Sequence, residues 1–233
     1  MMKLALNTIS KQFDQKIIFQ ETSFTFEQGK IYGLLGRNGA GKTTLFNCIA
    51  RNLVLEHGTI QFEEEDQLRD YDSTEIGFTQ TYPQLPAFMT AFEFIRFYMD
   101  IHKDKLRSSR SPEEWLTLVG IDHVDQHRLL KDFSHGMQNK VQLLLSLIVQ
   151  PAVLLLDEPL TSFDPVAAHE FKQLIRKAKK DSVIIFSTHI LQLAQDLCDE
   201  IVLLHHKELQ AVPTERLHDA DFEQEIVNLL ADK

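Results

Sequence analysis

Eight residues that follow an apolar segment have the composition of a loop that binds phosphate groups. Gly36 to Thr43 fits the pattern G-x-x-x-x-G-K-[ST] and lies between a predicted buried strand, Ile31 to Leu35, and a predicted helix. Glycines let backbone N–H groups surround a phosphate, and the helix N-terminus adds its dipole. Lys42 would reach the β- and γ-phosphate oxygens of a nucleoside triphosphate, and the Thr43 hydroxyl would ligate Mg²⁺. The sequence therefore predicts a nucleotide site here.

Two adjacent carboxylates end a second apolar segment. Val153 to Leu156 is apolar throughout and is followed directly by Asp157 and Glu158. Because the carboxyl ends of parallel strands share one edge of a sheet, this strand would deliver both acids beside the phosphate loop. Asp157 is then the carboxylate that binds Mg²⁺, and Glu158 is the group that polarises an attacking water. The alternative for an acidic pair at a strand end is a helix cap or a surface role.

The order of the predicted elements indicates the fold that would bring these motifs together. Leu4 to Ile9 and Ser23 to Phe26 alternate apolar and polar residues, as half-buried strands do. Between about Thr90 and Gln150 the pattern is helical, and afterwards strands alternate with helices. We expect an α/β fold with a P-loop NTPase core: a mainly parallel sheet, an N-terminal antiparallel β subdomain and an inserted α-helical subdomain.

These subdomains are expected to form one domain that spans residues 1–233. The core and the β subdomain would occupy residues 1–86 and 151–233, and the helical insertion residues 87–150. Further strands are expected at 58–62, 76–79, 183–186 and 201–204, and helices at 92–101, 112–119, 166–179 and 190–197.

The composition argues against several classes of protein. The chain has 233 residues, 43% hydrophobic and 25% charged, with two cysteines, which is typical of a globular protein from a reducing compartment. A formal net charge of −10 disfavours binding to a nucleic acid backbone. The longest apolar stretch, 141–156, is interrupted by polar residues and is shorter than the ~20 residues that span a bilayer. We therefore expect no nucleic acid partner, no direct membrane insertion and no export signal.

Further motifs follow one another in a definite order along the chain. Asp157-Glu158-Pro159 is followed by Thr161 to Pro165, and Ser187-Thr188-His189 ends a later predicted strand. Gln80 follows the strand predicted at 76–79, Phe133 to Gln138 precedes a predicted helix, and Phe13 lies near the N-terminus. Taken singly, Phe13 would more often be core and His189 a helix cap. In this order and spacing, the chain resembles the nucleotide-binding subunit of an ABC transporter over essentially its whole length.

The resemblance implies a set of roles for these residues. ATP and Mg²⁺ are the implied cofactors, with Lys42, Glu158 and His189 as the catalytic groups. His189 would steady the γ-phosphate, Gln80 would sense the metal, and Thr43, Gln80 and Asp157 would be its ligands. The residues expected to contact nucleotide are Phe13, which would stack on adenine, Gly36, Arg37, Asn38, Gly39, Ala40, Gly41, Lys42, Thr43, Thr44, Gln80, Ser134, Gly136 and Asp164.

Phe133 to Met137 departs from the family's usual signature, which is Leu-Ser-Gly-Gly-Gln. Ser134 and Gly136 are kept, whereas Phe133, His135 and Met137 replace the other three residues. Ser-x-Gly-Met resembles the signatures of bacterial export-type subunits, so export is the expected direction. By resemblance, this signature would cover the γ-phosphate that lies on the phosphate loop of a second ATP-binding subunit packed head to tail.

The resemblance also implies a membrane partner, a separate permease chain that would hold this subunit at the inner face of the cell membrane, on the cytoplasmic side. Its coupling segment would dock beside Gln80, on Leu85, Phe88 and one or more of Phe92, Phe94 and Phe97. The alternative for the aromatic residues between 92 and 98 is ordinary core. The rival function is that of a soluble ABC-type ATPase acting on ribosomes or DNA. The presence of a single cassette and the net charge of −10 disfavour this function.

Overall fold

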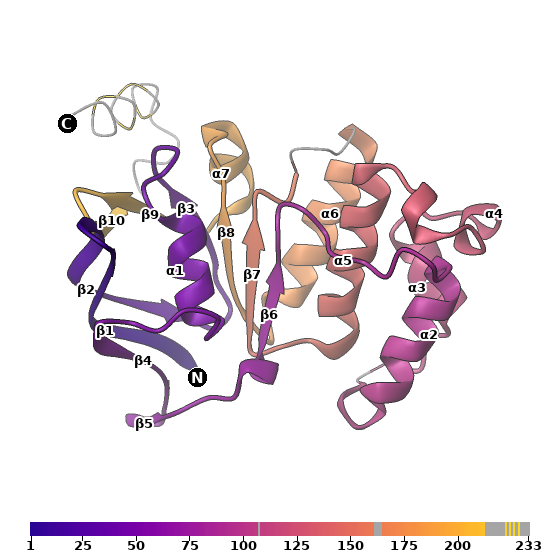
Figure 1. Cartoon of the computed structure of the whole chain (residues 1–233), viewed down its shortest axis with the longest axis horizontal. Coiled ribbons are helices and arrows are strands. Elements are labelled where there is room, and N and C mark those ends of the chain that lie inside the picture. The colour runs from indigo at the N-terminus through magenta and orange to yellow at the C-terminus, as the bar shows by residue number, and fades with distance from the viewer. Residues whose placement is uncertain are drawn as a thin grey trace.

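The computed structural model describes residues 1–106, 108–160 and 165–212, together with residues 222, 224, 226 and 228. Two β-sheets and a group of helices follow one another along the long axis, with the antiparallel sheet at one end and the helical block at the other (Figure 1). None of the helices in these ranges has both the length and the apolar character that crossing a bilayer requires.

The first sheet is antiparallel and is built by the N-terminal part of the chain in the order β2-β1-β4-β5. The β1–β2 hairpin is longer than the two strands predicted from alternation. The end of this hairpin near its turn is polar in sequence. Lys11 is nevertheless buried there and forms an ion pair with Glu56 at 2.8 Å. The strands are β1 (Lys3–Phe13), β2 (Lys16–Glu27), β4 (His57–Glu64) and β5 (Gln67–Arg69).

The second sheet has the order β10-β9-β3-β8-β7-β6, parallel except for β10 at one edge. Every residue of β3, β7 and β8 is buried, which explains why their sequences are apolar without alternation. β10 has no strand signal in the sequence because its two buried residues, Leu209 and Val212, lie three positions apart. The strands are β3 (Ile31–Leu35), β6 (Ile76–Thr79), β7 (Val153–Asp157), β8 (Val183–Ser187), β9 (Glu200–His205) and β10 (Glu208–Val212).

The register of the parallel strands brings three motif-bearing ends together. Leu34 pairs with Ser187 between β3 and β8, and Asp157 pairs with Ser187 between β7 and β8. The phosphate loop follows β3, Asp157 ends β7, and His189 follows β8 by two residues. All three therefore lie at the carboxyl edge of one sheet, where ligands bind in open α/β folds.

Helices cover both faces of this parallel sheet. On one face α1 (Lys42–Ile49) packs into a core that also contains Leu155 of β7 and the apolar side of the antiparallel sheet. On the other face α5 (His135–Val149), α6 (Pro165–Ala178) and α7 (Leu191–Leu197) share a core with Leu154 of β7. Successive residues of β7 thus face opposite cores, and the helix of the phosphate loop lies across the sheet from α5.

The chain between β6 and β7 forms α2 (Ala91–Ile101), α3 (Pro112–Leu118), α4 (His123–Gln126) and α5, in agreement with the predicted helical pattern. Capping boxes fix where the first two begin: Thr90 with Glu93 at α2, and Ser111 with Glu114 at α3. The predicted fold class is confirmed by this arrangement of sheets and helices. The boundaries 87–150 of the helical insertion stay a prediction.

Candidate functional site

The phosphate loop occupies residues 36–41 between β3 and α1, as predicted, and two of its glycines are sterically required. Gly41 has φ 110°, and a Cβ there would lie 2.2 Å from Cγ2 of Ile18. A Cβ on Gly36 would lie 2.8 Å from the carbonyl oxygen of Leu204. Only a residue without a side chain lets the backbone pass this close to β2 and β9.

Lys42 lies within this loop and is almost completely buried. Its ammonium donates to the carbonyl oxygen of Gly36 at 2.8 Å and to that of Arg37 at 3.4 Å. Burial is the largest influence and lowers the pKa of Lys42, while the charges of Glu158 and Asp157 act in the opposite direction. The charged form is thus destabilised by burial, and an anion that entered the loop would stabilise it.

Asp157 and Thr43 come together as the sequence predicted. The Thr43 hydroxyl donates to Oδ2 of Asp157 at 2.8 Å, and the Ser187 hydroxyl donates to Oδ1 at 2.5 Å. A carboxylate beside a hydroxyl is an oxygen donor set of the kind that Mg²⁺ prefers, and this ion usually takes only one or two protein carboxylates besides water and substrate phosphates. These two residues therefore fit a magnesium ion. Ser187 was missed as a site residue, although its strand register against Asp157 explains its position.

Glu158 and His189 form a pair that the sequence did not predict. Oε2 of Glu158 lies 2.9 Å from Nδ1 of His189, and the two side chains are 17% and 57% exposed. Because a carboxylate can only accept, the hydrogen lies on Nδ1 and Nε2 is left for another partner. The backbone N–H of Glu158 donates to Ser187 at 3.1 Å, and Glu158 has φ 52°. This left-handed turn directs Glu158 differently from Asp157, although the two are adjacent in the sequence.

One cavity of about 430 Å³ connects most of these groups. It is bordered by Phe13, which is 43% exposed and lies beneath the ammonium of Lys11 at 4.9 Å from the ring centroid. An exposed aromatic face at one end and a phosphate loop at the other suit a nucleotide, which carries a flat base and a charged tail. The predicted residues on this cavity are Phe13, Asn38, Gly39, Gly41, Lys42, Thr43, Thr44, Asp157 and Glu158.

Arg37 and His189 instead border a neighbouring cavity of about 650 Å³, which they share with Gly36 and Asn38. Ala40 lies on the other side of the loop, in a third cavity. Asp164 lies outside the residues that the structure describes, so its predicted contact stays a prediction.

Gln80 directly follows β6 but does not border the cavity of about 430 Å³, which we call the nucleotide cavity. The next residue, Thr81, does border it. Thr81 donates to the carbonyl oxygen of Asp157 at 3.2 Å. With its amide oriented to suit both partners, Gln142 of α5 donates to the carbonyl oxygen of Gln80 at 2.9 Å and accepts from its N–H at 3.1 Å. The segment 80–81 is therefore tied to both β7 and α5. No sequence signal indicated Gln142, because the bond goes to backbone atoms of a distant residue.

The signature residues lie away from the phosphate loop of their own chain. Ser134 caps the N-terminus of α5, where its hydroxyl accepts from the N–H of Met137 at 3.3 Å, and Gly136 lies in the first turn. Neither residue borders the nucleotide cavity. α5 lies beyond β6 and β7 as seen from α1 (Figure 1). A phosphate bound at Ser134 would thus be a different one from that at Lys42 of the same chain.

Comparison with known proteins agrees with this geometry. Residues 19–161 match the family model described as ABC transporter. The chain belongs to the ABC transporter family. This ABC ATPase is 32% identical to the ABC transporter ATP-binding protein YxlF of Bacillus subtilis over 88% of its own length and 69% of that protein. It is 31% identical to the ABC transporter ATP-binding protein NatA of the same organism, over 88% of this chain and 87% of NatA.

Relatives named for import and solved structures of the same fold also match the chain. The sulfate/thiosulfate import ATP-binding protein CysA of Pectobacterium atrosepticum is 29% identical over 91% of this chain and 67% of its own length. An ATP-binding subunit of an ABC transporter superimposes with a TM-score of 0.79 at 22% identity, over 97% and 98% of the two chains. The ATP-binding cassette MJ0796, in a dimeric structure of a post-hydrolysis state with ADP and phosphate, superimposes with a TM-score of 0.74 at 20% identity, over 91% of this chain and 98% of that chain. These structures support the fold.

Proposed function

We propose that this ABC ATPase hydrolyses ATP with Glu158 and His189 acting as a unit beside the phosphate loop. The observation that carries the proposal is the 2.9 Å contact between Glu158 and His189, at the sheet edge where Thr43 meets Asp157. The direct test is release of phosphate from ATP by the purified chain. Activity should require Mg²⁺ and stop with a chelator, and a rate that is unaffected by metal removal would contradict the proposal.

Each group has one task in this mechanism. Thr43 and Asp157 would hold Mg²⁺, which supplies charge neutralisation for the β- and γ-phosphates when bound. Lys42 would add a positive charge from within the loop, and the backbone N–H groups of the loop would hold the β-phosphate. Glu158 would orient and polarise the attacking water, and His189, held through Nδ1, would donate to the γ-phosphate from an Nε2–H, as an imidazole ring that carries hydrogens on both nitrogens can. These interactions strengthen as charge spreads over the γ-phosphate oxygens.

A second subunit would complete each site. Ser134 and Gly136 lie across the parallel sheet from α1, so they cannot cover a phosphate on Lys42 of the same chain. A head-to-tail dimer would place the signature of one subunit over the phosphate loop of the other. Ser134 would then offer its hydroxyl and the N-terminus of α5 its dipole to the γ-phosphate.

The proposed membrane partner is a permease that docks beside the segment 80–88. Phe88 is 83% exposed, Tyr82 77% and Phe97 52%. Phe92 and Phe94, in contrast, are half-buried and pack against the helical core together with Leu85. Large aromatic side chains that are exposed mark protein interfaces more often than other surfaces. An apolar segment of the permease would cover Phe88 and Phe97, and it would hold this subunit at the inner face of the membrane.

Replacing Phe88 by Asp is expected to release the subunit from membranes that contain its permease, because a carboxylate would be buried in an apolar contact. ATP binding should be unchanged, since Phe88 does not border the nucleotide cavity. Sedimentation of membranes with bound subunit would measure the effect. Val124→Asp is the control, because Val124 is 74% exposed and lies in the helical block. Persistent membrane association of the Phe88 variant, or equal release by both variants, would contradict the docking surface.

Replacing Gln142 by Leu is expected to raise the half-saturating Mg²⁺ concentration of hydrolysis by roughly five- to thirtyfold, since two hydrogen bonds worth ~1 kcal/mol each are lost. Without Gln142, the backbone of Gln80 loses both bonds to α5, and the position of the next residue, Thr81, which borders the nucleotide cavity, becomes less defined. Gln138→Leu on the same helix is the control, because Gln138 donates to the carbonyl oxygens of Leu130 and Phe133 instead. Equal shifts in both variants would contradict a specific role for Gln142.

The direction of transport is proposed to be export, on the strength of the Ser-x-Gly-Met signature. Relatives named as import proteins match this chain at 29% identity, so overall likeness does not favour either direction. Vesicles that contain the permease and this subunit would decide it. ATP-driven movement of substrate away from the side that carries this subunit is the expected result, and movement toward that side would contradict export.

A further inference from the structure

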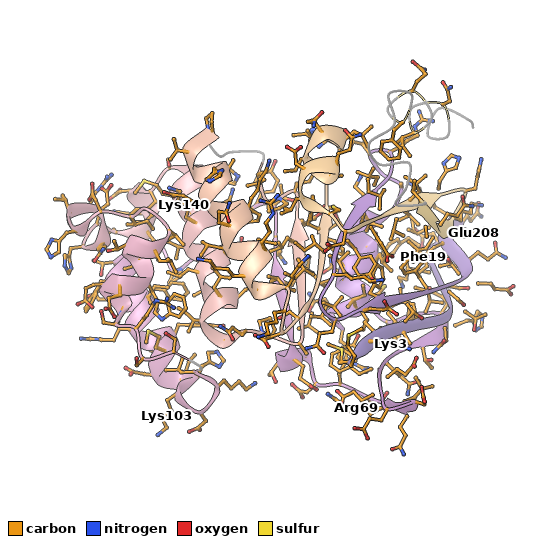
Figure 2. The ribbon with its side chains drawn as sticks, turned by 180° about the vertical axis from the view of Figure 1, so that it is seen from behind. Lys3, Phe19, Arg69, Lys103, Lys140 and Glu208 are labelled. Carbon is orange, nitrogen blue, oxygen red and sulfur yellow. The ribbon has the colours of Figure 1, made fainter. Side chains whose placement is uncertain are left out.

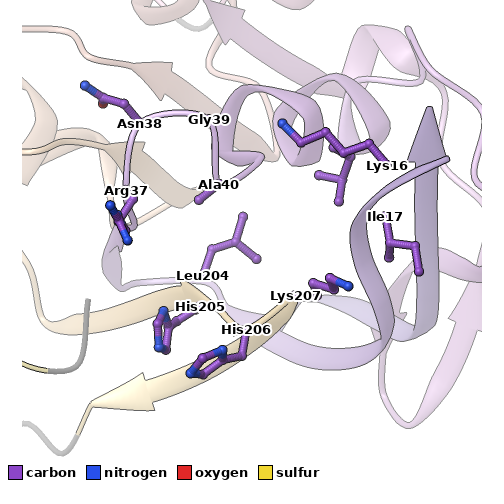
Figure 3. A pocket seen from close by; sticks show the side chains of 11 residues that line it. Lys16, Ile17, Arg37, Asn38, Gly39, Ala40, Leu204, His205, His206 and Lys207 are labelled. Atoms are coloured by element: carbon purple, nitrogen blue, oxygen red, sulfur yellow. The ribbon is translucent and has the colours of Figure 1, made fainter. Parts of the chain in front are cut away.

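The third cavity, which Ala40 borders, lies next to the nucleotide cavity on the other side of residues 38–40 of the phosphate loop. It has a volume of about 350 Å³, is open to solvent, and is bordered by β2, the loop 37–40 and the turn between β9 and β10 (Figure 3). Lys16, Ile18, Asn38 and Gly39 border both cavities, so the two cavities lie next to each other. This volume lies at the lower end of the range of small-molecule sites.

The lining of this cavity is cationic, although the whole chain has a net charge of −10. Among the residues that the structure describes, its charged or titratable ones are Lys16, Arg37, His205, His206 and Lys207, and none of them is Asp or Glu. Within the described residues, the side chains of Lys16, Arg37 and Lys207 take part in no ion pair, as is also true of cations elsewhere on the surface such as Arg96, Lys103 and Lys131. Like charges gathered in one place repel one another unless an anion lies between them.

The backbone holds the cationic turn in place against β2. The N–H of Gln20 donates to the carbonyl oxygen of Lys207 at 3.0 Å, and the N–H of Leu209 donates to the Thr22 hydroxyl at 2.8 Å. His206 and Lys207 have φ 47° and 70°, a region where glycine or asparagine is less strained. The turn therefore presents two basic side chains at positions whose backbone would favour a smaller residue.

The cavity also has an apolar floor. Leu204 lies at its centre with Ala40 above it, and the basic side chains lie around them in Figure 3. The rings of His205 and His206 lie side by side, with centroids 3.8 Å apart. A ligand that fits this lining has a negatively charged group for the cationic rim and a small apolar part for the floor.

We propose that this cavity is a second anion site, which binds a phosphate-bearing small molecule independently of the nucleotide at Lys42. Lys16, Arg37 and Lys207 bind the phosphate, and Leu204 and the two histidine rings contact the rest of the ligand. Because Asn38 and Gly39 border both cavities, occupancy of the second site changes the freedom of the loop that holds ATP. The binding itself does not depend on the proposed ATPase mechanism.

The test is calorimetric titration of the full chain with its nucleotide site already saturated by Mg²⁺ and the non-hydrolysable analogue AMP-PNP. Pyrophosphate and AMP are the two probes, which separate an inorganic source of the phosphate from a nucleotide source. We expect saturable binding of at least one probe, with one site per chain. The double variant His206→Gln/Lys207→Gln should weaken this binding at least tenfold, whereas its affinity for AMP-PNP should stay within twofold, since neither residue borders the nucleotide cavity.

The matched control is His102→Gln/Lys103→Gln, which removes an adjacent His-Lys pair from the end of α2. Lys103 lies at the opposite end of the molecule from Glu208, the residue that directly follows the turn at His206 and Lys207 (Figure 2). This variant has the same change in composition and should bind both probes as the wild type does. Single replacement of exposed Lys207 by Gln provides a second variant that leaves both histidines in place.

Three results would overturn the proposal. One is the absence of saturable binding by either probe. Another is an equal loss of affinity in the two double variants, which would indicate an effect of overall charge. The third is an equal loss of AMP-PNP and probe binding in the His206/Lys207 variant, which would show that these cations only attract ATP to its own site.

Discussion

Glu158→Gln is expected to slow ATP hydrolysis by ~10²- to 10⁴-fold, the usual contribution of a general base, while ATP still binds. The amide keeps the shape of the side chain and an oxygen that can accept from Nδ1 of His189, but it cannot polarise water as a carboxylate does. ATP binding persists because Lys42, Thr43 and Asp157 are unchanged. The ATP-bound dimer should therefore accumulate, which light scattering would detect beside an assay of phosphate release.

Glu65→Gln is the control for this variant. Glu65 is exposed at the turn between β4 and β5. Its replacement by Gln removes the same charge far from the sheet edge that carries the site. Its hydrolysis rate should equal that of the wild type. A loss smaller than about threefold in the Glu158 variant would exclude this residue as the base, given the size of such contributions.

Lys42→Ala is expected to weaken ATP binding by roughly 10- to 100-fold, since hydrogen bonds to charged groups are worth ~1.5 to 3 kcal/mol. The protein should nevertheless stay folded. Because burial lowers the pKa of Lys42, the folded chain holds this charge at a cost in free energy, which the phosphates of ATP would offset. Removing the ammonium therefore removes the cost of burying its charge from the free energy of folding. It also removes the attraction to the phosphates from the free energy of ATP binding.

Two measurements separate these effects. Titration with a fluorescent ATP analogue reports binding, and urea unfolding reports stability, which should fall by no more than ~1 kcal/mol. Lys30→Ala is the control, because Lys30 forms ion pairs with Glu27 and Glu200 outside the site. That variant should bind ATP normally. Tight ATP binding by the Lys42 variant would contradict the role of the loop.

The sequence predicted the parts of the site that depend on a motif beside a strand. Gly36 to Thr43 and Asp157 follow apolar segments that are fully buried strands, and the carboxyl ends of parallel strands must lie at one edge. The meeting of Thr43 with Asp157, 114 residues apart, follows from this rule. The helices α2 and α3 were predicted from their helical pattern, and capping boxes, which are local in sequence, fix where they begin.

Other features depend on contacts between distant residues and have no local signal. The Glu158–His189 pair needs the left-handed turn at Glu158, which no residue type announces. Gln142 acts on the backbone of Gln80, so neither side chain indicates the contact. Lys16 and Lys207 line the cationic cavity together because of where β10 lies. The alternation of apolar and polar residues in the sequence did not reveal this strand.

The most direct test of the proposed dimer is a mixing experiment with two inactive variants. Lys42→Ala has a defective phosphate loop and an intact signature, whereas Ser134→Phe has an intact loop and a signature that can no longer approach phosphate. In a head-to-tail dimer of the two, one composite site pairs the intact loop with the intact signature. Mixing equal amounts should therefore restore hydrolysis to about a quarter of the wild-type rate, because half of randomly formed dimers are mixed and each has one intact site. Activity no greater than the average of the separate variants would contradict sites shared between two subunits.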